Sequence, residues 1–209
     1  VYDTGDGDSA TLSLLCTTSL DGTWPFMLSV AATQFACTNL QVFITGGVGI
    51  YRAKHTKKLN IEHGAEVICN SLDIFNRERE LWNQLRNTPV SNNEAFEFFA
   101  KAIGANLTIK DKYHRNVRNN PDWLQDPSMR LGLMPRQNSN LRYIWNVYCA
   151  LYRDKLGANY WAVYNALTDW STHAGVSSQK NWDNLAAVKN DRQHLVRKAF
   201  KADNFLEAA

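Results

Sequence analysis

The spacing of apolar residues changes once along this chain, and that change constrains the fold more than any other feature. Before about residue 53, apolar side chains alternate with polar ones, as at Leu12, Leu14 and Cys16, which is typical of a half-buried strand. From Ile61 onward they recur every three or four residues, which is typical of amphipathic helices. The sequence therefore predicts an α+β fold, in which an N-terminal antiparallel sheet packs against C-terminal helices.

The N-terminal part contains the signals of a β-hairpin. Asp21-Gly22 separates two apolar runs, and glycine tolerates the positive φ that a tight hairpin turn needs. The returning strand starts near Pro25 and includes Phe26 and Leu28. We expect further strands over 35–44 and 48–53, so that residues 1–58 are mainly β.

The remaining residues, 59–209, are predicted to be mainly helical and to belong with the sheet to one domain over 1–209. Long helices are expected over 61–86, 141–152, 160–170 and 182–206. Ser91 and Glu94 form a capping box for a short helix that ends at Gly104. Residues 105–139 lack clear periodicity and are predicted to be an irregular basic loop. The spacing predicts that Trp82, Trp145 and Trp161 lie in the core.

Charge is distributed unevenly along the chain. Residues 1–51 contain no Lys or Arg and four Asp, so residues 52–209 hold 23 basic and 16 acidic side chains, a net charge of +7. A basic surface of this kind suits a polyanionic partner. No apolar run is long enough to cross a membrane, and the N-terminus has no signal-peptide pattern, so we expect no membrane partner. The chain does not start with Met, so we expect that it begins inside a longer protein or has lost leading residues by processing or cloning.

Motifs for catalysis and cofactors are weak. His55 and His63 lack the short spacing and companion ligands of a zinc site. The glycine-rich run 46–49 lacks the Lys-Ser/Thr of a P-loop and lies between expected strands, so a hairpin turn is the better interpretation. No nucleophile motif is present. The sequence therefore predicts no metal and no cofactor, and it favours a non-enzymatic protein over an unrecognised nuclease or hydrolase.

Nucleic-acid binding has the better support, because single-strand binders combine basic grooves with aromatic stacking platforms. Basic clusters occur at 52–58, 110–118 and 189–201, and Tyr113 lies inside the second. The alternative is an ordinary solvated basic face. The candidate nucleic-acid-binding residues are Arg52, Lys54, His55, Lys57, Lys58, Lys110, Lys112, Tyr113, Arg115 and Arg118.

A line of polar residues marks the helix expected over 160–170. Asn165, Asp169 and His173 follow i, i+4, i+8 spacing and therefore share one helix face. Such a line could bind a phosphate, a base or a partner protein. We favour a buried hydrogen-bond ladder, because no nucleophile or metal pattern accompanies it.

Four segments occur in a recognisable order: Thr18–Thr23 (TSLDGT), Phe35–Asn39 (FACTN), Arg52–Thr56 (RAKHT) and the late stretch Tyr160–His173, YWAVYNALTDWSTH. Together they resemble a family of phage- and plasmid-like proteins, the domain-of-unknown-function family 932. The resemblance spans about residues 12–200, and the late segment is the most specific. Where the family pattern has Arg before the Cys-x-Asn strand, this chain has Gln34 and Phe35.

The resemblance implies a mobile-element or viral protein in the cytoplasm of a bacterial host, acting in DNA replication, recombination or host takeover. It assigns no catalytic residues. Combined with the basic clusters, it leads us to expect a single-stranded DNA-binding protein, or one that binds other nucleic acid. The alternative is a non-enzymatic viral protein that binds and modulates a host protein. A homo-oligomer is compatible with either. The order of elements is also analogous to that of phage single-strand-annealing proteins.

Overall fold

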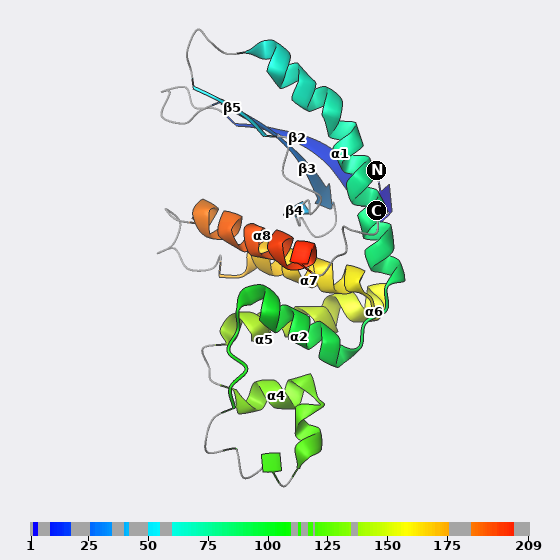
Figure 1. Ribbon diagram of the computed structural model, residues 1–209, viewed down its shortest axis with the longest axis vertical. Coiled ribbons are helices and arrows are strands. Elements are labelled where there is room, and N and C mark those ends of the chain that lie inside the picture. The colour runs from blue at the N-terminus through cyan, green and yellow to red at the C-terminus, as the bar shows by residue number, and fades with distance from the viewer. Residues whose placement is uncertain are drawn as a thin grey trace. The chain divides into compact units, whose positions relative to one another are not determined.

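The structure is a computed structural model of the 209-residue chain. It describes residues 2–3, 9–17, 26–34, 40–41, 50–54, 60–109, 113, 117–118, 120–134, 138–175 and 185–202. The chain divides into two compact units, Val1–Asn83 with Asn204–Ala209, and Gln84–Asp203 (Figure 1). That both units form one domain stays a prediction.

The first unit contains an antiparallel sheet. Its long strands, β2 (Ser9–Thr17) and β3 (Phe26–Gln34), pair along their length from Ala10 opposite Gln34 to Thr17 opposite Met27. The outer strand β1 (Tyr2–Asp3) pairs with β2, whereas β4 (Leu40–Gln41) and β5 (Ile50–Ala53) both pair with β3. The antiparallel sheet predicted for the N-terminal part is therefore confirmed, and the Asp21-Gly22 turn lies outside the described residues.

Helix α1 (Ile61–Asn87) is the longest element and starts in the first unit. Within that unit, Tyr2 of β1 packs edge-on against Trp82, with 5.2 Å between ring centroids, and donates a hydrogen bond from its hydroxyl to Asn83 Oδ1 over 3.0 Å. Phe75 contacts the same indole at 6.0 Å. Trp82 is fully buried, so its predicted place in the core is confirmed.

Helices make up the second unit, as the sequence predicts for this part of the chain. Figure 1 shows α7 and α8 lying beside α5 and α2. The elements are α2 (Asn92–Ile103), the 3₁₀ turn η2 (Pro121–Leu124), α4 (Pro127–Leu133), α5 (Ser139–Val147), the π-helix η3 (Tyr148–Tyr152), α6 (Arg153–Leu156), α7 (Tyr160–His173) and α8 (Leu185–Ala202).

The predicted capping box at the start of α2 is confirmed. The Ser91 hydroxyl accepts the Glu94 N–H over 3.2 Å, and the Glu94 carboxylate accepts the Ser91 N–H over 2.8 Å. These bonds lower the pKa of Glu94. At the other end, Gly104 adopts φ of +62°, a left-handed conformation that favours glycine.

The prediction that 105–139 is an irregular loop is wrong for its second half, because η2 and α4 lie there. Asp126 caps α4 by accepting the Ser128 N–H over 2.8 Å, and Pro127 occupies the first helical position. The helix has only seven residues, which is too short for a recognisable 3.6-residue period. Its stability comes from burying Leu131 and Leu133.

The core of the second unit is aromatic. Trp145 and Trp161 are buried, as predicted. Phe99 packs edge-on against Tyr148, with 5.3 Å between centroids, and Phe98 lies 4.9 Å from Phe200 of α8. Among the described residues, no helix combines the length and hydropathy that a membrane crossing requires.

Replacing Ser91 by Ala should lower the free energy of unfolding by about 1 kcal/mol, because it removes the acceptor for one N–H at the start of α2. Urea unfolding followed by circular dichroism measures this as a lower midpoint with an unchanged slope. The neighbouring Asn92→Ala, at an exposed position, is the matched control and should change the midpoint little. Equal effects of both substitutions would contradict the capping role.

A buried carboxylate held by two tyrosines

Helix α7 is enclosed by its neighbours. Residues 161–171 are all buried, and the helix contacts α2, α5, α6, α8 and η3. Asn159 begins it: its side-chain oxygen accepts the Ala162 N–H over 3.0 Å, and its amide nitrogen donates to the Leu156 carbonyl over 2.7 Å. An enclosed helix cannot leave its polar side chains to water, so each needs a partner within the protein.

Most polar side chains of α7 bond to the helix's own backbone. The Asn165 amide donates to the Trp161 carbonyl over 2.8 Å, and the Thr168 hydroxyl donates to the Asn165 carbonyl over 2.9 Å. Ser171 and Thr172 both donate to the Thr168 carbonyl over 2.8 Å. Hydroxyl and amide groups can thus donate hydrogen bonds to carbonyls of their own helix. A carboxylate has no hydrogen to donate, so it cannot bond to these carbonyls.

Asp169 obtains its donors from outside the helix. Its Oδ1 accepts the Tyr143 hydroxyl over 2.7 Å, and its Oδ2 accepts the Tyr152 hydroxyl over 3.1 Å. The Asp169 side chain is buried, with 8% exposure. We call these three residues the Asp169 cluster. Sequence reasoning identified Asp169 but not the tyrosines.

The π-helix explains how both tyrosines reach one carboxylate. Elements α5, η3 and α6 follow each other without a break. On a regular α-helix, Tyr143 and Tyr152 would be about 180° apart, at 100° per residue over nine residues. The wider π turn absorbs about one residue, which reduces their separation to that of residues eight apart, about 80°. Nothing in the sequence marks this bulge.

Arg192 of α8 closes the C-terminal end of α7. Its guanidinium donates to the carbonyls of Trp170 and Ala174 and lies 5.1 Å from the centre of the Trp170 ring. Burial lowers the pKa of Arg192, and the nearby Tyr143 acts in the opposite direction. Burial also raises the pKa of the Tyr143 hydroxyl, and the hydrogen bond and negative charge of Asp169 raise it further.

The Asp169 cluster links α5 and η3 to α7, because the buried carboxylate accepts one tyrosine hydroxyl from each of them. His173, the third residue of the predicted polar face, is half-buried at the last position of α7. Across the described ranges, no three His, Cys, Asp or Glu side chains gather in a way that could hold a metal ion.

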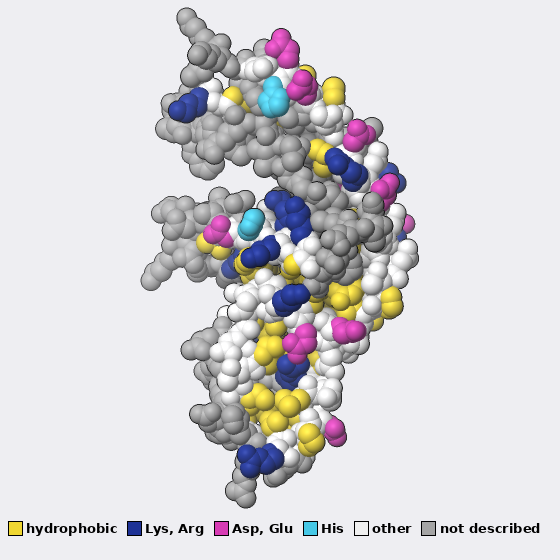
Figure 2. All heavy atoms as spheres, viewed as in Figure 1, with side chains coloured by type: hydrophobic (Ala, Val, Ile, Leu, Met, Phe, Trp, Pro, Cys, Tyr) yellow, Lys and Arg dark blue, Asp and Glu magenta, His cyan; other side chains and the backbone are white. Residues whose placement is uncertain are grey.

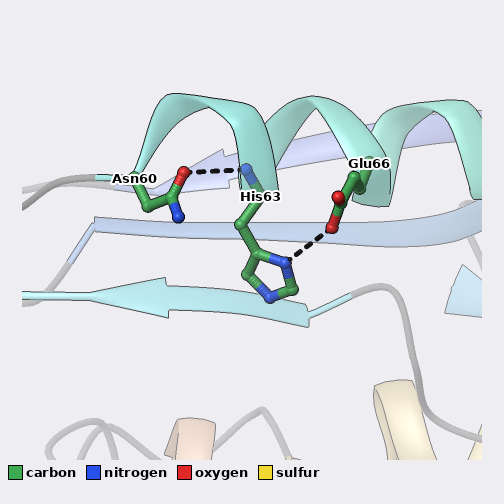
Figure 3. Close-up of polar contacts among 3 residues, drawn as sticks. All are labelled: Asn60, His63 and Glu66. Carbon is green, nitrogen blue, oxygen red and sulfur yellow. Dashed lines mark hydrogen bonds and ion pairs between the residues drawn. The ribbon is translucent and has the colours of Figure 1, made fainter.

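His63, considered above as a metal ligand, lies in the first turn of α1 (Figure 3). Its Nδ1 is 3.0 Å from Glu66 Oε2, and both side chains are mostly exposed. Its backbone N–H donates to Asn60 Oδ1 over 3.0 Å, so Asn60 caps the helix. The carboxylate partner and the cap explain these polar contacts without a ligand.

The predicted nucleic-acid-binding residues are only partly described. In the first unit, Arg52 lies on β5 opposite Met27, and Lys54 is exposed after that strand. In the second unit, Tyr113 is half-buried and Arg118 is exposed. The remaining candidates, His55, Lys57, Lys58, Lys110, Lys112 and Arg115, lie outside the described residues.

Helix α8 presents a basic face to solvent. It carries five Lys and Arg side chains against one acid, Asp191, a net charge of +4. Lys198 and Lys201 are exposed and share a face with His194 through i, i+4, i+7 spacing. Figure 2 shows Lys and Arg side chains gathered over α8 on the face in view. Val188 and Leu195 are exposed beside this row. We call the row His194, Lys198 and Lys201 the basic row.

Tyr143→Phe should lower the free energy of unfolding by about 2 kcal/mol, because it removes a hydrogen bond to a buried charged group. Tyr152→Phe should also destabilise, and the double variant should be non-additive because both hydroxyls serve one carboxylate. Tyr148→Phe is the matched control. The Tyr148 hydroxyl is buried and has no hydrogen-bond partner in the described part of the chain, so its removal should be neutral or stabilising. Equal destabilisation by the Tyr143 and Tyr148 substitutions in urea unfolding would contradict the cluster.

Alkaline pH should reduce the advantage of the wild type over Tyr143→Phe. The raised pKa of Tyr143 means that the folded protein keeps the proton which the unfolded chain loses above about pH 10. The stabilisation is therefore fully present below that pH and is lost as pH rises. Urea unfolding of both proteins at pH 8 and pH 11 measures the difference, and a constant difference would contradict the assignment.

Comparison with known proteins identifies the family of this chain. No curated protein and no solved structure matches it. A family model described as "Domain of unknown function (DUF932)" matches residues 2–200, which include β1, the Asp169 cluster and the basic row except Lys201. The resemblance noted in the sequence is thereby confirmed, and the chain belongs to the DUF932 family.

Proposed function

We propose that this protein binds nucleic acid, with single-stranded DNA as its target, and that α8 supplies a principal contact. The observation that supports this is the exposed basic row on a helix of net charge +4. Lysines spaced along one helix face can each neutralise a phosphate and release its counterions. The basic candidates of the strand–helix junction and of 110–118 would each supply further phosphate contacts, with Tyr113 as a stacking residue.

The phage or plasmid origin and the bacterial cytoplasm are parts of the same proposal. They rest on the motif resemblance, as does a role in replication or recombination. The predicted hairpin turn at Asp21-Gly22 is also part of the proposal, and it rests on the sequence signal alone.

A second candidate is a protein that binds and modulates a host protein. The observation in its favour is that Val188 and Leu195 are exposed, at 39% and 38%, next to the basic row. A face that is both apolar and basic suits an acidic amphipathic partner. Leu195→Ser separates the two functions, because it should weaken a protein complex and leave the salt-dependent binding of DNA nearly unchanged.

An enzymatic role has less support. A nuclease or hydrolase built from His55, Asp169 and His173 would use Asp169 as a base or ligand, but this carboxylate is buried and accepts two tyrosine hydroxyls.

Fluorescence anisotropy with a labelled single-stranded oligonucleotide tests the proposal. Binding should weaken steeply from 50 to 200 mM salt. Lys198→Gln with Lys201→Gln should weaken binding at 50 mM salt and reduce the slope of log K against log salt by about 1.4, since each single-strand phosphate that a lysine neutralises contributes about 0.7. Lys155→Gln, an exposed lysine on α6, is the matched control and should leave the slope unchanged. A flat titration at 50 mM salt, or equal slopes for all variants, would overturn the proposal.

A further inference from the structure

A cavity of about 160 Å³ lies between α4 and α5, apart from both the Asp169 cluster and the basic row. It is lined by Ser128 and Leu131 of α4 and by Arg142, Trp145 and Asn146 of α5. Leu131 and Trp145 are almost fully buried, whereas Ser128 and Asn146 are exposed. The cavity therefore combines apolar walls with polar groups that solvent reaches.

Arg142 is the charged group of this cavity. One of its terminal nitrogens donates to the Leu131 carbonyl and, over 3.5 Å, to the Met134 carbonyl. These bonds hold the half-buried side chain in place without neutralising it. Nearby Arg130 differs, because it forms an ion pair of 2.6 Å with Glu97 and lies over the Phe96 ring. Within the ranges that the structure describes, no acid pairs with Arg142, so its fork of donors is only partly used.

Two further donors line the same cavity. The Trp145 indole N–H donates to the Ser128 hydroxyl oxygen over 3.1 Å, which leaves the hydroxyl hydrogen available to donate. The Asn146 side chain is exposed and carries an amide with two N–H groups. None of the five lining residues is acidic. Asp126 is the acid bonded to a lining residue, and its Oδ1 accepts the backbone N–H of Ser128 as the helix cap.

We propose that this cavity binds a single oxyanion group, a carboxylate or a phosphate, between Arg142, Ser128 and Asn146. The planar guanidinium matches the two oxygens of such a group better than a lysine would. The volume supports one group, because pockets for whole drug-sized ligands begin at about 300 Å³. The remainder of the ligand would extend into solvent past the exposed Asn146. The inference is independent of nucleic-acid binding by α8.

An NMR titration tests it with a local probe. Inorganic phosphate and acetate are added separately to the ¹⁵N-labelled protein at constant ionic strength, with chloride as the reference salt. The Trp145 indole N–H signal should shift and saturate with at least one of the two anions. Saturation by phosphate at the lower concentration assigns a phosphate group, and by acetate a carboxylate. If neither phosphate nor acetate shifts the Trp145 signal more than chloride does, the proposal is overturned.

Asn146→Asp is the decisive variant, since the substitution is nearly isosteric, lies at an exposed position and places a negative charge at the cavity. It should weaken anion binding at least fivefold. Asn140→Asp makes the same change on the same helix away from the lining residues, and it should leave binding unchanged. Equal affinities for the two variants would mean an adventitious ion only and would overturn the proposal. Arg142→Lys should also weaken binding, because it keeps the charge and loses the fork.

The two proposals fail separately. If the α8 lysine variants leave DNA binding unchanged and the Trp145 signal still saturates, only the proposed function is overturned. If DNA binding follows the basic row and the Trp145 signal stays at its chloride position, only the oxyanion site is overturned.

Discussion

The enclosure of α7 is the constraint on which the rest of the second unit depends. A helix buried on all sides gives up water as a hydrogen-bond partner for each of its polar side chains. Hydroxyls and amides on α7 solve this by donating to carbonyls one turn earlier. A carboxylate has no hydrogen to donate, so Asp169 requires donors from a neighbouring helix. The enclosure of one helix thus dictates that α5 and η3 present hydroxyl donors to it.

The π-helix follows from that requirement. A regular helix from Ser139 to Leu156 would direct one of the two tyrosines away from Asp169. The bulge brings both to the carboxylate, at the cost of poorer local backbone geometry. A half-satisfied buried carboxylate is more costly than an apolar side chain, whereas a fully bonded one ties the α5–α6 segment to α7 in one register. Arg192 adds α8 to the same arrangement through the carbonyls at the end of α7.

The polar residues of the second unit serve two purposes. The polar side chains of α7 form hydrogen bonds within the protein, and those of Asp169 hold neighbouring helices together. The groups available to a ligand lie elsewhere, on the outer face of α8 and around the cavity between α4 and α5. Both places present cationic side chains, and both suit negatively charged ligands. The scale differs: a helix face can follow a chain of phosphates, and the small cavity admits one group.

Local signals predicted the features that depend only on neighbours in sequence. Ser91 and Glu94 specify the start of α2 because a capping box involves four consecutive residues. The burial of Trp82, Trp145 and Trp161 follows from helical spacing, and the boundary between sheet and helices follows from the change of period near Ile61. The family was recognisable because the Tyr160–His173 segment is specific as a string of residues. What these signals could not supply were the partners of Asp169 and the short helix α4. The first depends on a bulge that shifts Tyr152 by about 100°, and the second on burial of two leucines. Both are decided only when helices pack, because a side chain's partners across helices are set by tertiary geometry and not by its position in the sequence.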